Sequence, residues 1–206
     1  MTNVKNSFLN ADKVFKYFYK KIIKDGIKYG DTKALFNIGF YLQNPSDVDI
    51  THKEWEWYLT EDPHISQLGE IYGNVPPIWE KMQDSEGKCR SNYGWQWSRN
   101  YQLDHVVAML KEIKDTRQAA ISIYDGKEIN TYTKDTPCTY AVQFSIVNNK
   151  LNMAVLMRSN DLWYGFCNDQ YCFSMLQKLV SQRINVPIGT YYHFAHNLHL
   201  YNNKIK

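Results

Sequence analysis

The chain has 206 residues, of which 44% are hydrophobic and 22% are charged, so it can bury the core of one domain. Its formal net charge of +3 is small and its basic residues are scattered, which argues against direct binding of duplex nucleic acid. No stretch approaches the roughly 18 apolar residues of a membrane span, and the N-terminus lacks an apolar signal core. We expect a soluble, cytoplasmic protein with a single domain over 1–206 and no membrane partner.

The cysteines do not indicate a disulfide framework or a metal site. They are few and scattered, and the one close pair has no second pair that would complete a zinc site; the four are Cys89, Cys138, Cys167 and Cys172. We expect reduced thiols and no metal.

Apolar residues at helical spacing predict a first helix over 14–23, which the turn residues Asp25 and Gly26 end. The later patterns predict, in chain order, a strand over 35–42, an aromatic helix over 52–59, an irregular ordered loop over 74–99, a helix from 103 to 113, strands over 119–124, 141–147 and 151–157, and a helix over 172–180. Asn148 and Asn149 tolerate positive φ, so the last two strands should form a hairpin.

Cys138 follows a proline and opens a predicted strand. By position alone, such a cysteine is more often a small packed hydrophobe. If strands 139–147 and 151–157 pair, however, Arg158 lies beside Cys138, and a cation there lowers the pKa of a thiol. Arg158 and Ser159 also suit an oxyanion such as phosphate, although a surface salt bridge is the alternative for Arg158.

Other residues carry weaker signals. Glu54 lies among aromatic residues, where desolvation would raise its pKa and suit it to proton transfer, unless it lies on a solvated helix face. His199 and Tyr201 alternate on a strand-like segment and can both bind a sugar hydroxyl, although such a histidine is more often structural. Tryptophans more often pack in cores, but three of them can stack on a flat ring: Trp79, Trp95 and Trp97.

Six motifs carry a resemblance to one enzyme family. In chain order they are Tyr93-Gly-Trp-Gln-Trp97, Asp115-Thr-Arg117, Thr136-Pro-Cys138-Thr-Tyr-Ala-Val-Gln143-Phe, Met157-Arg158-Ser159-Asn160-Asp161, Gly165-x-x-x-Asp169 and His199-Leu-Tyr201. Their order and spacing are similar to those of thymidylate synthase and its phage relatives, the deoxycytidylate hydroxymethylases, from roughly residue 50 to residue 201. The resemblance implies an α+β fold, a mixed sheet packed with helices, and a homodimer formed sheet to sheet.

The resemblance also implies the reaction. The Cys138 thiolate would add to C6 of a pyrimidine nucleotide, and C5 would then capture the one-carbon unit of the co-substrate 5,10-methylenetetrahydrofolate. Glu54, in the segment Glu-Trp-Glu-Trp-Tyr-Leu, matches the family's proton-shuttling glutamate. With Asp161 and Asp169, these residues form the expected catalytic set.

The matched binding residues fall into four groups. The phosphate ligands would be Arg117, Arg158 and Ser159, with Arg117 reaching in from the partner subunit of the homodimer. The ribose ligands would be His199 and Tyr201, and the folate-side residues would be Trp79 and Asp161. Tyr93 and Gln143 match positions that line the site.

Asp169 selects the base in this interpretation. Thymidylate synthase has asparagine at the matching position, where its amide donates to uracil O4 and accepts from N3–H. Cytosine presents the inverse edge, so an acid that shares a proton with N3 and accepts from the N4 amino group favours dCMP over dUMP. The resemblance therefore implies a dCMP hydroxymethylase, in the host cytoplasm if a phage encodes it.

Several alternatives stay open. Hydration and hydride reduction of the one-carbon intermediate are not distinguished, so methylation of dUMP or dCMP is an alternative. A nucleotide-binding homologue without folate chemistry is another, because Gln118 replaces a second family arginine and the family's closing segment is expected to be missing. The early loop also has no arginine, for which Lys28 or Lys33 would substitute. We also expect the chain, which ends at Lys206, to lack the usual C-terminal closing segment.

Overall fold

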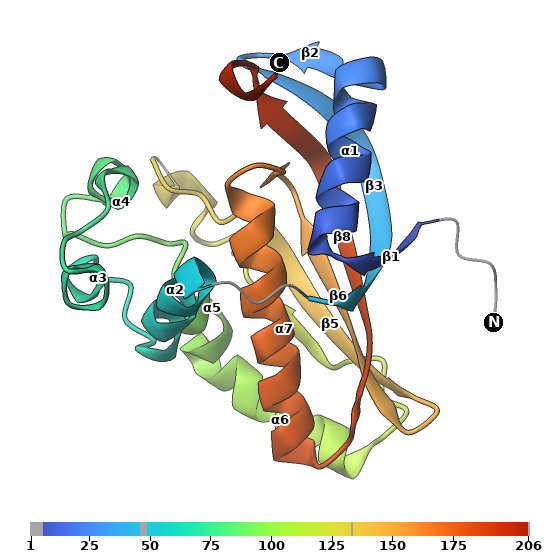
Figure 1. The fold of residues 1–206 in the computed structure, drawn as a ribbon. Helices are drawn as coiled ribbons and strands as arrows, with labels where there is room; N and C mark the ends of the chain where they lie inside the picture. The colour runs from blue at the N-terminus through green and yellow to red at the C-terminus, as the bar shows by residue number, and fades with distance from the viewer. Residues whose placement is uncertain (1–5, 46–48, 133, 206) are drawn as a thin grey trace.

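The computed structural model describes residues 6–45, 49–132 and 134–205. In this part of the chain, eight strands form one mixed sheet in the order β1-β3-β8-β6-β5-β4, with β2 paired to β3 and β7 paired to β8 (Figure 1). The strands are β1 Ser7–Asn10, β2 Ile27–Tyr29, β3 Thr32–Asn44, β4 Ala120–Ser122, β5 Thr139–Val147, β6 Lys150–Met157, β7 Asn160–Asp161 and β8 Ile188–Tyr201. The pairs β3–β8 and β5–β6 are antiparallel, whereas β6 and β7 run parallel to β8.

Helices cover this sheet and extend away from it. The α-helices are α1 Ala11–Asp25, α2 Asp49–Leu59, α3 Ser66–Tyr72, α4 Pro77–Met82, α5 Tyr93–Ser98, α6 Gln102–Glu112 and α7 Gly165–Ile184. Helices α1 and α7 pack directly on the sheet, α2 and α6 pack on α7, and α3 and α4 form a lobe beyond α2 (Figure 1). This mixed sheet with its helices confirms the expected α+β architecture. Among the described residues, no helix combines the length and apolarity needed to cross a bilayer.

Two local predictions are confirmed with their physical causes. Helix α1 buries Val14, Phe18 and Ile22 on one face and ends before Gly26. Strands β5 and β6 form the predicted hairpin, and Asn148 and Asn149 have φ values of 51° and 56° in its turn.

The prediction of an irregular loop over 74–99 is wrong, because this segment contains α4 and α5. Pro77 occupies the start of α4, where its missing N–H costs nothing. The side chain of Asn92 accepts from Trp95 N at 2.8 Å and caps α5. Both are sequence signals for helix starts that the abundance of glycine, proline and tryptophan obscured.

The predicted ends of two other elements need correction. Strand β4 covers only Ala120–Ser122 of the predicted strand 119–124. Helix α7 begins at Gly165, seven residues before the predicted 172, so Asp169 lies on its first turns. This early start determines which way the Asp169 side chain can point.

Helices α2 and α5 approach so closely that Gly94 is required between them. A Cβ at Gly94 would lie 1.6 Å from the carbonyl oxygen of Tyr58. We expect Gly94→Ala to lower the free energy of unfolding by about 3 kcal/mol, because backbone atoms must move apart. Urea denaturation followed by tryptophan fluorescence measures this loss. Gly126→Ala is the matched control, since a Cβ at Gly126 meets nothing within 4 Å. Equal effects of the two substitutions would contradict the prediction.

Candidate active site

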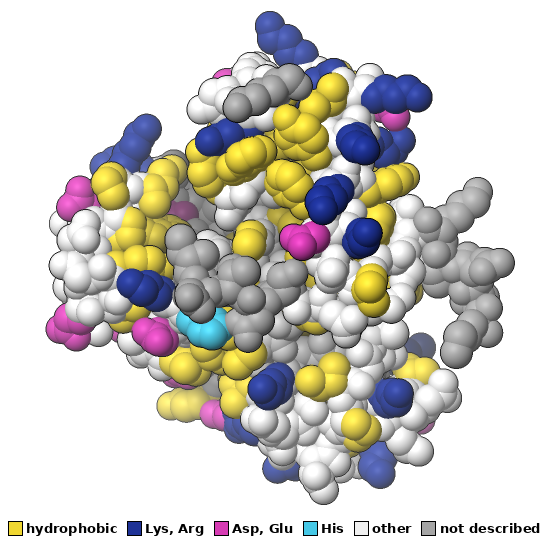
Figure 2. Space-filling model, viewed as in Figure 1, with side chains coloured by type: hydrophobic (Ala, Val, Ile, Leu, Met, Phe, Trp, Pro, Cys, Tyr) yellow, Lys and Arg dark blue, Asp and Glu magenta, His cyan; other side chains and the backbone are white. Residues whose placement is uncertain are grey.

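A cleft of about 610 Å³ lies between the α3–α4 lobe and the part of the chain that joins β7 to α7. Hydrophobic side chains gather on both sides of the recess between α1 and this lobe (Figure 2). Nine of the predicted site residues line the cleft: Glu54, Trp79, Tyr93, Cys138, Ser159, Asp161, Asp169, His199 and Tyr201. Residues more than a hundred positions apart in the sequence thus line the same cleft.

Cys138 and Arg158 lie together at the end of the β5–β6 hairpin, as predicted. Arg158 Nη2 is 3.8 Å from Cys138 Sγ. The guanidinium also donates to the carbonyls of Pro137 at 2.9 Å and Thr136 at 2.8 Å, and Arg158 N donates to Cys138 O. Arg158 therefore holds the backbone segment that carries the thiol. It does not itself line the cleft.

The expected depression of the Cys138 pKa below its ordinary value is wrong. Burial raises the pKa of the Cys138 thiol to about 11, and the Arg158 guanidinium offsets only part of that rise. The negative charges of Asp169, Asp135 and Asp161 also raise this pKa, each by less than burial does. The sequence predicts the cation and places Asp161 and Asp169 in the same site, but it does not predict the depth of burial or the contribution of Asp135.

Glu54 lies on α2 and is buried against aromatic residues, as predicted. Burial raises the pKa of its carboxyl, and hydrogen bonds from Tyr58 and Asn168 partly counteract that rise. The Tyr58 hydroxyl donates to Glu54 Oε1 at 2.6 Å. Tyr58 was not predicted as a site residue, although its position four residues after Glu54 on a helix is a usable signal.

Asp169 projects from α7 into the cleft. Burial raises the pKa of its carboxyl well above the ordinary range, and the negative charge of Glu54 raises it further. A hydrogen bond from Asn160 Nδ2 to Asp169 Oδ2, at 2.6 Å, favours the charged form and acts in the opposite direction. The net result is a carboxyl group that keeps its proton above the ordinary pKa of aspartic acid.

This raised pKa gives a stability prediction. In the unfolded chain Asp169 loses its proton near its ordinary pKa, whereas in the folded protein it holds the proton to higher pH. Its stabilising contribution is therefore complete at acid pH and is lost as the pH rises through the folded pKa. We expect Asp169→Asn to be more stable than the wild type at neutral pH, with a difference that shrinks on acidification. Urea denaturation across this pH range measures it, and a difference that grows on acidification would refute it.

His199 and Tyr201 lie on β8 with complementary hydrogen-bonding roles. His199 Nδ1 is 3.0 Å from Asn197 Oδ1, so Nδ1 carries the hydrogen of the neutral ring and Nε2 is left as an acceptor. Burial lowers the pKa of His199, which favours this neutral form. The Tyr201 hydroxyl supplies a donor. Together they match the acceptor and donor that one sugar hydroxyl requires.

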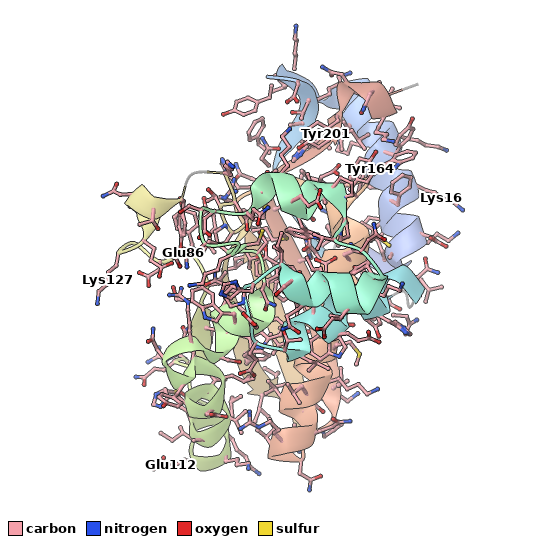
Figure 3. The ribbon with its side chains drawn as sticks, turned by 90° about the vertical axis from the view of Figure 1, so that its left-hand side faces the viewer. Lys16, Glu86, Glu112, Lys127, Tyr164 and Tyr201 are labelled. Carbon is pink, nitrogen blue, oxygen red and sulfur yellow. The ribbon has the colours of Figure 1, made fainter. Side chains whose placement is uncertain are left out.

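The rim of the cleft is aromatic. Trp163 and Tyr164 are exposed, and the Lys204 ammonium lies 5.1 Å and 4.8 Å from their ring centroids. Tyr164 and Tyr201, both labelled in Figure 3, line this cleft. Asp161 accepts hydrogen bonds from the backbone N–H groups of Trp163 and Tyr164, so it shapes the turn before α7 as well as facing the cleft.

Two predicted residues lie elsewhere in the single chain. Arg117 is exposed between α6 and β4 and does not line the cleft. Gln143 lies on β5, on the strand face opposite that of Val142 and Phe144, and its amide donates to the carbonyls of Ala119 and Phe144. Within one chain, neither residue joins the predicted group.

Other sequence candidates also lie outside the cleft. Trp97 is buried in the core, and Trp95 packs between the guanidinium groups of Arg90 and Arg99. Lys33 donates to the carbonyl of Ile23 at the end of α1, and Lys28 lies on the exposed strand β2. Of the three tryptophans proposed for stacking, Trp79 is the one that lines the cleft.

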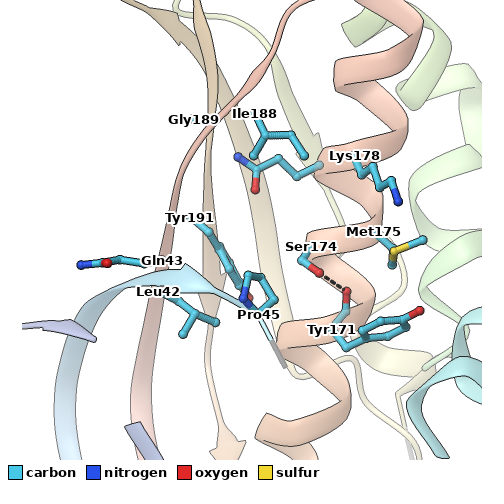
Figure 4. Close-up of a pocket in the computed structure, with 11 residues that line it drawn as sticks. Leu42, Gln43, Pro45, Tyr171, Ser174, Met175, Lys178, Ile188, Gly189 and Tyr191 are labelled. Atoms are coloured by element: carbon cyan, nitrogen blue, oxygen red, sulfur yellow. Dashed lines mark hydrogen bonds between the residues drawn. The ribbon is translucent and has the colours of Figure 1, made fainter. Parts of the chain in front are cut away.

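A second cavity of about 230 Å³ lies where α7 faces the start of β8 and the end of β3 (Figure 4). Leu42, Tyr171, Met175, Ile188 and Tyr191 are among its lining residues. It contains none of the predicted catalytic residues. The described residues also include no group of three or more His, Cys, Asp or Glu side chains that could hold a metal ion.

Known proteins resemble this chain in sequence and in fold. The family model described as thymidylate synthase matches residues 45–206. The chain belongs to the thymidylate synthase family. Thermostable thymidylate synthase A from Bacillus subtilis has the same fold, with a TM-score of 0.78 and 20% identity over 93% of this chain and 80% of that chain. The expected thymidylate synthase-like fold is thus confirmed.

Two relatives bear on the choice within the family. Deoxycytidylate 5-hydroxymethyltransferase of Enterobacteria phage T4 is 40% identical over 143 residues, which are 65% of this chain and 56% of that protein. Thymidylate synthase of Buchnera aphidicola subsp. Acyrthosiphon pisum (strain APS) is 28% identical over 216 residues, which are 91% of this chain and 80% of that protein. The match therefore spans about half the length of the phage relative, and the resemblance to this family is confirmed.

Proposed function

We propose that the chain is a dCMP hydroxymethylase that transfers a one-carbon unit from methylenetetrahydrofolate to C5 of dCMP and then adds water. The net reaction joins dCMP, the methylene carbon and water into 5-hydroxymethyl-dCMP and leaves tetrahydrofolate, with no net oxidation. The observation that carries the proposal is the Asp169 carboxyl, whose pKa is raised by desolvation, in the same cleft as the Cys138 thiol. The 40% identity to the phage T4 enzyme supports it.

Asp169 would recognise the cytosine ring. A protonated carboxyl offers one donor and one acceptor side by side, which complement cytosine N3 and the N4 amino group. When the thiolate adds to C6, negative charge develops on the ring, and a proton given to N3 offsets it. A carboxyl with a raised pKa is suited to hold that proton until the addition occurs.

Cys138 would form the covalent bond to C6. Its raised pKa means that the thiol holds its proton, so a neighbouring base must take this proton before the sulfur attacks C6. The Arg158 guanidinium then stabilises the thiolate from 3.8 Å. Glu54, with its own raised pKa, would carry protons on the side of C5, where one proton leaves during substitution.

The remaining residues would position the nucleotide. Arg158 and Ser159 directly follow β6 beside the thiol. Ser159 lines the cleft, and Arg158 would meet the 5′-phosphate with the N–H groups that do not donate to Pro137 and Thr136, while His199 with Tyr201 suits the ribose 3′-hydroxyl. We propose that Arg117 completes the phosphate site of the partner subunit in a homodimer formed through the sheets. Its exposure on the single chain and its distance from the cleft are consistent with that role.

The cleft also has groups that fit a folate. Trp79, Ile78 and Pro76 provide apolar and aromatic surface for a flat pterin ring, and Tyr93 lines the same cleft. Asp161, although it already accepts two backbone hydrogen bonds, keeps a charged edge toward the same space. The co-substrate would supply the one-carbon unit at the oxidation level of formaldehyde.

Release of tritium from 5-tritiated dCMP tests the proposal, because it requires both thiolate addition and substitution at C5. The purified chain should release tritium from dCMP with methylenetetrahydrofolate present, and mass spectrometry should detect the mass of 5-hydroxymethyl-dCMP. Release from 5-tritiated dUMP alone would refute the assignment of Asp169. No release from either nucleotide would refute the enzymatic proposal.

A methylating activity is the second candidate. The Buchnera thymidylate synthase matches 91% of this chain, which is a longer match than that of the phage enzyme. In that case the product mass would correspond to a methyl group in place of the hydroxymethyl group. The same mass measurement therefore separates the two candidates.

A further inference from the structure

A chain of buried polar side chains reaches Asp169 from the core behind it. The Tyr191 hydroxyl is 3.0 Å from His193 Nδ1, and His193 Nε2 is 3.0 Å from Asn160 Oδ1. Asn160 Nδ2 then donates to Asp169 Oδ2 at 2.6 Å. Tyr191, His193 and Asn160 are each at most 2% exposed. A buried polar chain of this kind is costly unless every member is satisfied, so its arrangement is specific.

The hydrogen bonds in this chain of side chains all run in one direction. Asn160 uses its amide nitrogen on Asp169, so its oxygen must accept from His193 Nε2–H. Burial lowers the pKa of His193 to about 3, so the ring is neutral and its Nδ1 accepts from the Tyr191 hydroxyl. The His193 ring stacks on Phe40 at a centroid distance of 5.2 Å and an interplanar angle of 20°, which holds its orientation. Every donor in the chain therefore points toward Asp169.

Gly165 makes room for the last bond of this chain. A Cβ at Gly165 would lie 3.3 Å from both Asn160 Nδ2 and Asp169 Oδ2. Contacts this short are unusual for a real Cβ, so the two side-chain atoms would have to shift. The glycine that starts α7 thus lets the Asn160–Asp169 hydrogen bond lie directly against the helix backbone.

We propose that Asn160 is a specificity-determining residue, because its amide fixes the proton of Asp169 on the oxygen that faces cytosine N3. A protonated carboxyl can pair with either pyrimidine, depending on which oxygen carries the hydrogen. With the hydrogen on Oδ1, Oδ1 donates to cytosine N3 while Oδ2 accepts from the N4 amino group. With the hydrogen on Oδ2, the same group would donate to uracil O4 and accept from uracil N3–H.

Asn160 prevents the arrangement that would pair with uracil, in which the hydrogen lies on Oδ2. Because Asn160 Nδ2–H donates to Oδ2, this oxygen is held as an acceptor, and its second lone pair is available for the cytosine amino group. Uracil would then meet a donor opposite its N3–H and an acceptor opposite its O4, which leaves polar groups unpaired in the cleft. Asp169 without its hydrogen bond from Asn160 therefore does not discriminate against dUMP. With that hydrogen bond, Asp169 discriminates against dUMP.

This inference rests on the proposed function, in which Asp169 faces the base, and nucleotide binding without folate tests it separately. Calorimetric titration gives the dissociation constants of dCMP and dUMP for the wild type and for Asn160→Leu. The ratio of the dUMP constant to the dCMP constant should fall by ~10-fold or more in Asn160→Leu, with dUMP binding improved. If Asn160 had a merely structural role, its replacement would weaken the binding of both nucleotides equally. That outcome, or an unchanged ratio, would overturn the proposal.

Two further variants keep the test decisive. Gly165→Ala should also lower the ratio of the dUMP constant to the dCMP constant, because its Cβ would press on the Asn160–Asp169 hydrogen bond. An unchanged ratio in this variant would overturn the proposal even if Asn160→Leu does not fold. Asn152→Leu is the matched control, because Asn152 Oδ1 accepts from Thr190 N at 2.8 Å in the same sheet but lies outside the cleft. It should leave the ratio unchanged, and a fall as large as that of Asn160→Leu would overturn the proposal.

The outcomes also separate this inference from the proposed function. A wild type that prefers dCMP but releases no tritium from it would refute the one-carbon chemistry and leave the role of Asn160 intact. A wild type that prefers dCMP, with the same preference in Asn160→Leu, would refute the role of Asn160 alone. A wild type with no preference would overturn both the substrate assignment and this inference.

Discussion

Cys138→Ala should release tritium from 5-tritiated dCMP at least ~10⁴-fold more slowly than the wild type, because substitution at C5 requires a covalent bond at C6. Nucleotide binding should persist, since the phosphate, ribose and base contacts proposed for the cleft do not involve the sulfur. Tritium release in the presence of methylenetetrahydrofolate and calorimetric titration with dCMP measure the two quantities. Turnover close to that of the wild type would remove Cys138 from its proposed role.

The thiol at Cys167 provides the control for this experiment. Cys167 also lines the cleft and also has a pKa raised by burial, but it lies on α7 rather than beside Arg158. Cys167→Ala should keep most of the activity, because no cation faces its sulfur among the described contacts. If both alanine variants lost activity equally, the loss would reflect a change in cleft shape rather than the missing nucleophile.

Asp169→Asn should lower kcat for dCMP by roughly 10²–10⁴-fold, because an amide donates a hydrogen bond to N3 but cannot transfer a proton to it. Binding of dCMP should weaken by less than about 10-fold, since Asn160 would hold the new amide with its oxygen on the Oδ2 side and its N–H groups toward N3. Tritium-release kinetics and calorimetry separate the two effects. Equal losses in kcat and in affinity would contradict the proton-transfer role.

The double variant Asp169→Asn/Asn160→Leu extends this prediction. Without Asn160 the amide can turn, and it then donates to uracil O4 and accepts from N3–H. We expect this double variant to bind dUMP more tightly than the single Asp169→Asn variant does. Calorimetric titration with dUMP measures the difference, and equal affinities would show that the amide of Asn160 does not set the orientation of residue 169.

The fold and the cleft lining were largely predictable from the sequence. Motif order and spacing predict nine of the residues that line the cleft, and the β5–β6 hairpin brings Arg158 to Cys138 because two asparagines allow its tight turn. Glu54 and its aromatic neighbours are consecutive, so its raised pKa followed from local sequence. Short-range patterns of this kind depend on residues that stay neighbours whatever the rest of the chain does.

The electrostatics of the site required the tertiary structure. The Cys138 pKa depends on burial and on charges that include Asp161 on β7 and Asp169 on α7, both beyond the hairpin that carries the thiol. The hydrogen-bonded chain from Tyr191 to Asp169 joins β8, β7 and α7, and no spacing in the sequence indicates that His193 faces Asn160. The sequence by itself determined which groups the site contains. The packing of distant elements decided their protonation and orientation, because burial and hydrogen-bond direction exist only once those elements meet.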